Sequence, residues 1–425
     1  MIIDFSLKNF RSFKNEQVFS FLAEHTSNRL SENFVQIEGN KYSVLKTSGV
    51  YGANASGKSN LLLGIEALRY LICLSGDSKD GDPISCYEPF KLSSDTVNSP
   101  TKFEIEFLLN GLRYVYEVEF NSTKILSELL SYYPTTHPAV LFKRQEEDSW
   151  ENIYFGSHYK GGKKKHPFFE NSTYLSKAGN SADSPKIIRQ VYNYFRSDIF
   201  RLGTGERAGV LEWKSKPDFV KKVSKILTKV DTGISGIRFD EEESENNNLK
   251  FGKEVPEEIK RLISKSEQLR PIFLHESGNG ESIEFTKQME SSGTQKLYEL
   301  LPLLLTSLSS GGVLLLDELD NSLHPHIAEF IIQLFNTPEV NVNNAQLLFT
   351  THNINLMSPK ILRRDQIWLT EKNNGETILI GLSEFDKSTV KQDSPFRKWY
   401  AQGRFGAIPR IDMDAITSIF LDEEK

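Results

Sequence analysis

The stretch SGVYGANASGKSNLLLGIEAL, residues 48–68, decides the fold class of this chain. An apolar segment ends at Gly52, four residues follow, and Gly57, Lys58 and Ser59 then lead into a second apolar segment. A strand, a glycine-rich loop and a helix in this order are typical of the loop that binds nucleotide phosphates. The alternative is a glycine-rich connector without a ligand, which the strand–loop–helix context disfavours. The sequence therefore predicts a phosphate-binding loop.

Each part of this loop has an expected role. Gly52 and Gly57 permit backbone angles that turn successive N–H groups toward phosphate oxygens, and the start of the following helix adds its dipole. Lys58 supplies positive charge to the outer phosphates and is a catalytic candidate, while the Ser59 hydroxyl is the expected magnesium ligand. The residues expected to contact the nucleotide are Gly52, Ala53, Asn54, Ala55, Ser56, Gly57, Lys58, Ser59 and Asn60.

Composition limits what kind of protein carries this loop. With 425 residues, 38% of them hydrophobic and 25% charged, the chain has the make-up of a globular protein of one large or two to three smaller domains. A net charge of −6 gives no overall basic surface, so a nucleic-acid contact would need a local patch. Two cysteines are too few for a disulfide framework. No secretion signal and no run of 18 apolar residues is seen, which predicts a cytoplasmic protein without a membrane contact.

Hydrophobic periodicity predicts the order of the elements. Alternating patterns over residues 2–21 and on both sides of Asn110-Gly111 predict antiparallel strands, the second pair as a hairpin. From residue 294 onward, apolar strands alternate with helices. We expect an α/β protein with a mixed sheet, an antiparallel N-terminal β lobe and an inserted, partly helical region. The expected division is 1–120 for the N-terminal lobe, 121–270 for the insertion and 271–425 for the C-terminal lobe.

A second motif identifies the class of nucleotide-binding protein. The segment GGVLLLDE, residues 311–318, is an apolar strand that ends in Asp317 and Glu318. Ligands of open α/β sheets bind at the carboxyl ends of the strands, so Asp317 is the expected second magnesium ligand and Glu318 would polarise the attacking water. The alternative is a strand that meets a charged turn. More than half of the chain separates Lys58 from Asp317, so a large insertion divides the site.

Further segments resemble the ATPase heads of the ABC type. MESSGTQKL, residues 289–297, resembles the signature sequence of that family, with Ser292 and Gly293 matching and Thr294 in place of the second glycine. LDNSLHP, residues 319–325, stands where the D-loop belongs, with His324 in place of the usual aspartate. The resemblance implies a P-loop NTPase of the ABC-head type in which Ser292 and Gly293 of one subunit contact the nucleotide of the other.

Two more residues acquire roles from this resemblance. In LLFTTHN, residues 347–353, His352 matches the switch histidine that senses the γ-phosphate and is a catalytic candidate. In NFRSF, residues 9–13, Arg11 matches the arginine of SMC-type heads and would contact a phosphate or the adenine. Considered alone, each residue reads as an ordinary strand-end or surface side chain. The order of all five segments along the chain favours the ABC-type interpretation.

The closest resemblance is to stand-alone bacterial AAA-type ATPases with an ABC-like core, related to OLD and abortive-infection proteins. KWYAQGRFGAIPRI, residues 398–411, looks like the tail of those proteins, and the chain ends too soon after His352 for the TOPRIM domain of OLD nucleases. The resemblance implies binding and hydrolysis of ATP with Mg²⁺ and closure of a homodimer, or a higher homo-oligomer, around the nucleotide. It also implies a separate effector protein in anti-phage defence.

Two other functions stay open at the level of sequence. One is a DNA-repair ATPase of the SMC kind, although no heptad repeat predicts a coiled-coil arm and the net charge is acidic. The other is a scaffold that assembles in the presence of nucleotide with little turnover. The lysine-rich loop at residues 160–166 is either solvated or a polyanion contact, so nucleic acid is possible but not indicated.

Overall fold

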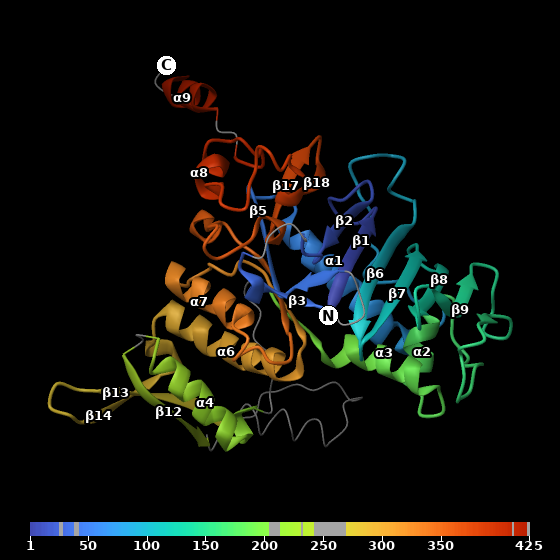
Figure 1. Cartoon of the computed structure of the whole chain (residues 1–425), viewed down its shortest axis with the longest axis horizontal. Coiled ribbons are helices and arrows are strands. Elements are labelled where there is room, and N and C mark those ends of the chain that lie inside the picture. The colour runs from blue at the N-terminus through green and yellow to red at the C-terminus, as the bar shows by residue number, and fades with distance from the viewer. Residues whose placement is uncertain are drawn as a thin grey trace.

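Two large sheets lie on either side of the helix that follows the phosphate-binding loop (Figure 1). The computed structural model describes residues 1–24, 29–37, 42–203, 213–230, 233–241, 269–409 and 412–422. The helix is α1 (Lys58–Cys73), and its buried apolar side chains belong to the hydrophobic cluster that also contains the first sheet. The site therefore begins where the two layers meet.

The first sheet is antiparallel and seven-stranded. Its order is β10-β9-β8-β7-β6-β1-β2, from strands β1 (Ile2–Lys8), β2 (Gln17–Ser20), β6 (Thr101–Leu109), β7 (Leu112–Phe120), β8 (Ile125–Tyr133), β9 (Ala139–Gln145) and β10 (Tyr154–Phe155). Burial alternates along β6, as expected for a sheet with one covered face. The hairpin predicted at Asn110-Gly111 is confirmed, with positive φ at both turn residues.

The second sheet is mixed and carries the site. Its order is β11-β15-β16-β5-β17-β18, from strands β11 (Ile199–Leu202), β15 (Val313–Leu316), β16 (Gln346–Thr350), β5 (Thr47–Gly52), β17 (Ile367–Asn373) and β18 (Glu376–Gly381). All neighbours are parallel except β17 and β18. Every residue of β5, β15 and β16 is buried, as in sheets with helices on both faces. Parallel strands bring their carboxyl ends to one edge.

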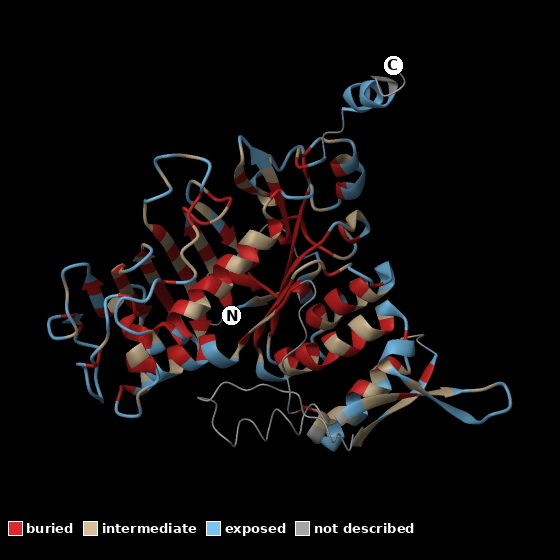
Figure 2. Cartoon of the chain, turned by 180° about the vertical axis from the view of Figure 1, so that it is seen from behind, coloured by how far each residue is buried: buried red, intermediate tan, exposed pale blue. Residues whose placement is uncertain are grey.

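Two helices cover the far face of the second sheet, away from α1. They are α6 (Ser292–Ser310) and α7 (Pro325–Asn336), whose buried residues form a second hydrophobic cluster with the sheet. Figure 2 shows buried residues concentrated along the central strands and the helix faces turned toward them. Other helices are α2 (Tyr174–Gly179), α3 (Lys186–Ser197), α4 (Pro217–Leu227), α8 (Phe396–Ala401) and α9 (Met413–Asp422).

Smaller elements complete the architecture. A three-stranded sheet of β12 (Ile234–Glu241), β13 (Leu269–Glu276) and β14 (Ser282–Thr286) packs beside α4, and a two-stranded sheet joins β3 (Phe34–Gln36) to β4 (Ser43–Leu45). Short 3₁₀ turns span Ser31–Asn33, Ser75–Asp77, Trp213–Ser215, Lys287–Met289, Ile354–Leu356, Arg364–Gln366 and Leu382–Glu384. Among the described residues, no helix is long and apolar enough to cross a membrane.

The seven-stranded sheet continues beyond residue 120, the expected end of the N-terminal lobe. Strand β8 pairs with β7 over most of its length, although it belongs to the expected insertion, 121–270. Strand β11, also from that stretch, forms one edge of the second sheet. Only part of 121–270 therefore lies outside the two main sheets. The sequence DEEESENNN, residues 240–248, predicts an acidic, solvated surface loop, and it lies almost wholly outside the described residues.

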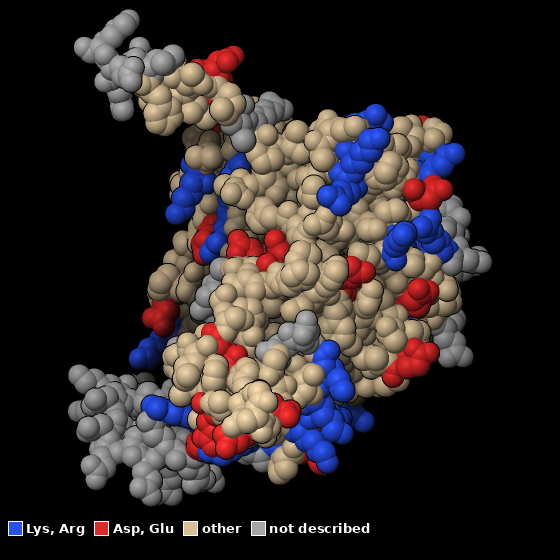
Figure 3. Space-filling view, turned by 90° about the vertical axis from the view of Figure 1, so that its left-hand side faces the viewer, with Lys and Arg blue, Asp and Glu red and all other residues tan. Residues whose placement is uncertain are grey.

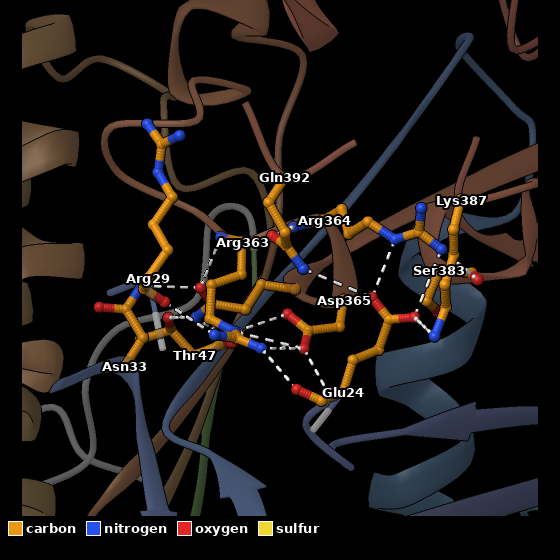
Figure 4. Close-up of polar contacts among 11 residues, drawn as sticks. Glu24, Arg29, Asn33, Thr47, Arg363, Arg364, Asp365, Ser383, Lys387 and Gln392 are labelled. Carbon is orange, nitrogen blue, oxygen red and sulfur yellow. Dashed lines mark hydrogen bonds and ion pairs between the residues drawn. The ribbon is translucent and has the colours of Figure 1, made fainter. Parts of the chain in front are cut away.

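A buried network of charged groups joins the N-terminal part of the chain to the C-terminal part (Figure 4). Arg363 forms a two-pronged ion pair with Asp365, and both side chains are at most 2% exposed. Arg364, equally buried, pairs with Glu24 at 2.9 Å. Arg363 also donates to the backbone oxygen of Arg29 at 2.7 Å. Since buried charges are tolerated only when they are paired, these contacts fix the two segments against each other.

Candidate nucleotide-binding site

The phosphate-binding loop connects β5 to α1, in the strand–loop–helix arrangement that the sequence predicts. Within it, Ala55 and Gly57 have φ angles of 60° and 108°. A Cβ at Gly57 would overlap the Thr377 hydroxyl and lie 2.8 Å from Ser12 Oγ. Thr377 donates to the Ser56 carbonyl at 2.7 Å. The loop is therefore held against β18 at a position that only glycine can occupy.

Replacing Gly57 by alanine is expected to abolish nucleotide binding. The added methyl group is incompatible with both the positive φ and the contact with Thr377, so the loop has to move. Gly81→Ala is the matched control, because Gly81 has a φ of 79° but open space around its Cα. Titration with a fluorescent ATP analogue measures both variants. Binding by Gly57→Ala at the wild-type affinity would contradict this account of the loop.

Lys58 lies buried at the centre of the loop. Its ammonium donates to the backbone oxygens of Gly52 and Ala53, each at 3.0 Å. Burial lowers the pKa of Lys58, while the nearby carboxylates of Asp317 and Glu318 act to raise it. The ammonium is therefore held on carbonyl oxygens, the same kind of acceptor that phosphate oxygens would provide.

Two oxygen ligands suited to magnesium face each other beside this lysine. Ser59 Oγ donates to Asp317 Oδ1 at 2.8 Å, although the two residues are far apart in the sequence. Thr350, at the end of β16, donates to the same Asp317 oxygen at 2.6 Å. A hydroxyl and a carboxylate are oxygen ligands of the type that Mg²⁺ prefers. The donor set thus fits the cation that the sequence predicts.

Glu318 follows Asp317 with an unusual backbone. Its φ is 53°, in the left-handed region that non-glycine residues rarely adopt. Its N–H donates to Thr350 Oγ1 at 2.8 Å, and one carboxylate oxygen accepts from Asn321 at 3.4 Å. Strained backbone of this kind is typical of functional sites, where the surrounding contacts maintain it.

His352 lies at the end of the neighbouring strand and lines the same cavity as the loop. Its backbone N–H donates to Asp320 Oδ1 at 3.2 Å, and the Thr351 hydroxyl donates to the same oxygen. Partial burial, followed by the positive charge of Lys58, lowers the pKa of His352. The structure therefore brings His352 to the edge of the sheet where Lys58 and Asp317 lie.

The cavity beside the loop has a volume of about 560 Å³. Part of its wall comes from the C-terminal stretch 398–411, for which the sequence predicted no part in the site. The residues concerned are Tyr400, Ala407, Ile408 and Pro409. The Tyr400 hydroxyl donates to the Ala407 carbonyl at 2.9 Å and closes this turn. From β17, Glu371 and Lys372 also line the cavity. Sequence reasoning did not assign these residues to the site.

Arg11 lies near the loop but is directed elsewhere. Its guanidinium pairs with Glu88 at 2.8 Å, with both side chains partly exposed. The next residue, Ser12, accepts from Asn60 at 2.7 Å, so the segment lies directly against the start of α1. A contact of Arg11 with a nucleotide stays a prediction, and it would require the pair with Glu88 to open.

Ser292 and Gly293 form the start of α6, which Ser291 caps by accepting from the Thr294 N–H at 3.1 Å. A Cβ at Gly293 would lie 2.8 Å from the carbonyl oxygen of Ser322, so α6 begins against the turn that follows Glu318. Among the described residues, the wall of the cavity includes neither Ser292 nor Gly293. The role of these two residues stays a prediction.

The sequence of the chain matches a known family over most of the chain's length. Residues 48–358 match the family described as "AAA domain, putative AbiEii toxin, Type IV TA system". The chain belongs to this family. Family membership and the topology of the mixed sheet confirm the predicted α/β P-loop NTPase fold with its antiparallel β lobe. Membership of a P-loop ATPase family implies that this AAA domain binds nucleotide, typically with Mg²⁺.

Solved structures include two similar chains. An SMC head, solved bound to the C-terminal winged-helix domain of ScpA, shares 13% identity, with 92% of this chain and 99% of that chain covered and a TM-score of 0.41. CbiO1 from Clostridium perfringens, part of the ABC transporter complex CbiONQ, shares 12% identity, with 88% and 95% covered and a TM-score of 0.27. The search of curated proteins found no match to this chain.

Proposed function

We propose that this AAA domain binds and hydrolyses ATP with Mg²⁺ and that two copies close around the nucleotide. The observation that carries the proposal is the contact of Ser59 with Asp317 beside the buried Lys58. In the proposed complex, Lys58 and the loop N–H groups bind the phosphates, and Ser59 and Asp317 hold the metal. Magnesium, when bound, neutralises charge that develops on the phosphate oxygens.

The remaining residues supply the proton chemistry of the proposal. Glu318 accepts a proton from the attacking water, for which it has to lie in line with the terminal phosphate. His352, just beyond the end of the neighbouring strand, donates a hydrogen bond to that phosphate. Thr350 orients both acids, since it donates to Asp317 and accepts from the Glu318 N–H. Hydrolysis would therefore determine how long the closed pair persists.

The expected dimer depends on the exposed start of α6. Ser292 is exposed, which suits a residue that completes the site of a second copy. A ligand can favour the closed pair only through tighter binding to it than to separate chains. Contacts from Ser292 and Gly293 to a nucleotide held by the other copy would supply that difference.

Mixing two inactive variants tests the shared site. Lys58→Ala removes the loop cation, and Ser292→Arg blocks the start of α6, so each variant alone should lose ATPase activity. In a mixture, the Lys58→Ala chain provides its intact α6 to the intact loop of the Ser292→Arg chain, and phosphate release should return. Ser309→Arg, an exposed change on the last turn of the same helix, is the control and should keep wild-type activity.

Two results would contradict the shared site. If Ser292→Arg retains wild-type turnover, α6 does not contact the nucleotide. If the mixture stays inactive while each variant is folded, no composite site forms. Assembly in ATP without turnover would instead favour the scaffold function.

We extend the proposal to a separate effector protein that the ATP-dependent closure switches in anti-phage defence. The support is the family description, which names a toxin of a toxin–antitoxin system. Purification of the wild-type protein and of Glu318→Gln from infected cells, with comparison of the proteins that accompany each, tests this extension. An effector should accompany one nucleotide state preferentially.

A further inference from the structure

Helix α9 has an apolar face that nothing in the described chain covers. Met413, Ile416, Ile419 and Phe420 are 62%, 41%, 61% and 69% exposed, and they follow the spacing of one helix face. Asp414, Thr417 and Ser418 occupy the other face. Figure 1 shows α9 projecting beyond the end of the molecule that contains β17 and β18.

The helix has its own start signal but little else to stabilise it. Asp412 accepts from the Ala415 N–H at 3.0 Å, a cap on the first turn. Isolated helices shorter than about 12–15 residues are marginal in water, and most helical stability in proteins comes from packing of an apolar face. Every residue from Asp412 to Phe420 is exposed. A capped helix with an uncovered apolar stripe is therefore a segment that gains stability by docking.

A groove with matching chemistry lies between α4 and the start of α7. Its volume is about 740 Å³, and its apolar wall consists of Ile226, Val230, Ile327 and Phe330. Lys225, Lys229, His324 and His326 complete the lining. Both lysines are exposed, and neither forms an ion pair within the part of the chain that the structure describes. The groove is thus apolar at its base and basic at its rim.

The two surfaces are complementary in charge as well as in polarity. The sequence from 412 to 425 contains acidic residues at 412, 414, 422, 423 and 424 against a single lysine at 425. Figure 3 shows α9 standing clear of the body with acidic atoms beside it, while lysine and arginine atoms are spread over the rest of that face. An amphipathic helix with anchors at i, i+3 and i+7 is the usual occupant of an apolar groove.

Helix α9 is too far from the α4–α7 groove of its own chain to dock there. Pro409 is fixed in the wall of the nucleotide cavity, and the chain from there to Met413 spans at most about 14 Å. Helix α4 lies at the opposite end of the molecule from α9 (Figure 1). We propose that α9 of one chain docks in the α4–α7 groove of a second chain, so that copies associate through exchanged C-terminal helices without nucleotide.

Complementation between two full-length variants tests this exchange in nucleotide-free protein. The helix variant carries Ile416→Asp, Ile419→Asp and Phe420→Asp, and the groove variant carries Lys225→Glu and Lys229→Glu. Each should be monomeric in sedimentation where the wild type self-associates, with association weakened about tenfold or more. All five side chains are at least partly exposed, so both variants should keep the thermal stability of the monomer fold.

An equimolar mixture distinguishes this interface from any other. The groove variant retains an intact α9 and the helix variant an intact groove, so the mixture should form pairs that neither forms alone. Val342→Asp and the pair Lys160→Glu with Lys165→Glu alter exposed apolar and basic side chains elsewhere, and both should associate as the wild type does.

Three outcomes would overturn the exchange. They are a wild type that stays monomeric without nucleotide at tens of micromolar, a helix variant that still self-associates, and a mixture that remains monomeric. Failure of the ATP-dependent closure proposed above would leave these results unchanged, because no nucleotide is present.

Discussion

Replacement of Glu318 by glutamine should leave ATP binding intact and slow hydrolysis by about 10²- to 10⁴-fold, the usual contribution of a positioned general base. Glutamine keeps the size of the side chain and the contact with Asn321, but it cannot accept the proton of the attacking water. Single-turnover assays of phosphate release measure the hydrolysis step, and nucleotide titration measures binding.

Glu339→Gln is the matched control, because Glu339 is an exposed acid that follows α7 and belongs to none of the motifs of the site. It removes the same charge and should hydrolyse ATP at the wild-type rate. A Glu318→Gln protein with wild-type turnover would assign the base to another residue. Loss of binding by this variant would mean that Glu318 supports the loop rather than the reaction.

The same variant makes the proposed closure measurable. If slow hydrolysis prolongs the closed pair, the solution mass of Glu318→Gln should rise on addition of ATP and Mg²⁺ and fall after chelation of the metal. The measurement is best made in the helix variant of α9, in which the nucleotide-independent association is removed. If the solution mass in the helix variant does not change on addition of ATP, the result would contradict closure. It would not bear on the exchange of α9.

The largest expected effect on stability comes from Arg363→Met. The change leaves the Asp365 carboxylate buried without its ion-pair partner, and removal of one member of a buried pair typically destabilises by about 3–5 kcal/mol. It also removes the donors to the backbone oxygens of Arg29 and Glu24. Urea unfolding, followed by fluorescence, gives the change in the free energy of unfolding.

The control is an arginine that also pairs with acidic side chains but lies in solvent. Arg238 pairs with Asp240 and Glu284, and all three side chains are close to half exposed. Surface ion pairs contribute little, so Arg238→Met should unfold at the wild-type urea concentration. If Arg363→Met also unfolds at the wild-type urea concentration, the buried network does not hold the two segments of the chain together.

Sequence patterns located the elements of the site well because the signals are local. The apolar strand before Gly52 and the helix after it were predictable, as was the strand that ends at Asp317. Parallel strands place their carboxyl ends together, which is why Lys58 and Asp317 could be expected near His352. The structure shows these residues around one sheet edge, while their roles in binding and catalysis stay predictions.

What the sequence did not indicate depends on pairs that are distant along the chain. Thr377 supports the loop from an antiparallel edge strand, and nothing in its own neighbourhood marks it. The partner of Arg11 is Glu88, which no motif connects to it. The expected boundary at residue 120 follows the end of the clear hairpin pattern, whereas the continuation of the sheet into β8 depends on cross-strand pairing.

The position of β5 in its sheet has a consequence for how the protein is made. Both neighbours of β5 come from the end of the chain, since Thr47 pairs with Leu347 and Gly49 pairs with Ile367. A ribosome therefore releases the nucleotide loop long before the strands that flank it. Non-local pairing of this kind slows folding and leaves unpaired strand edges exposed to other chains. The loop therefore acquires its flanking strands only after β16 and β17 have been synthesised, long after the loop itself.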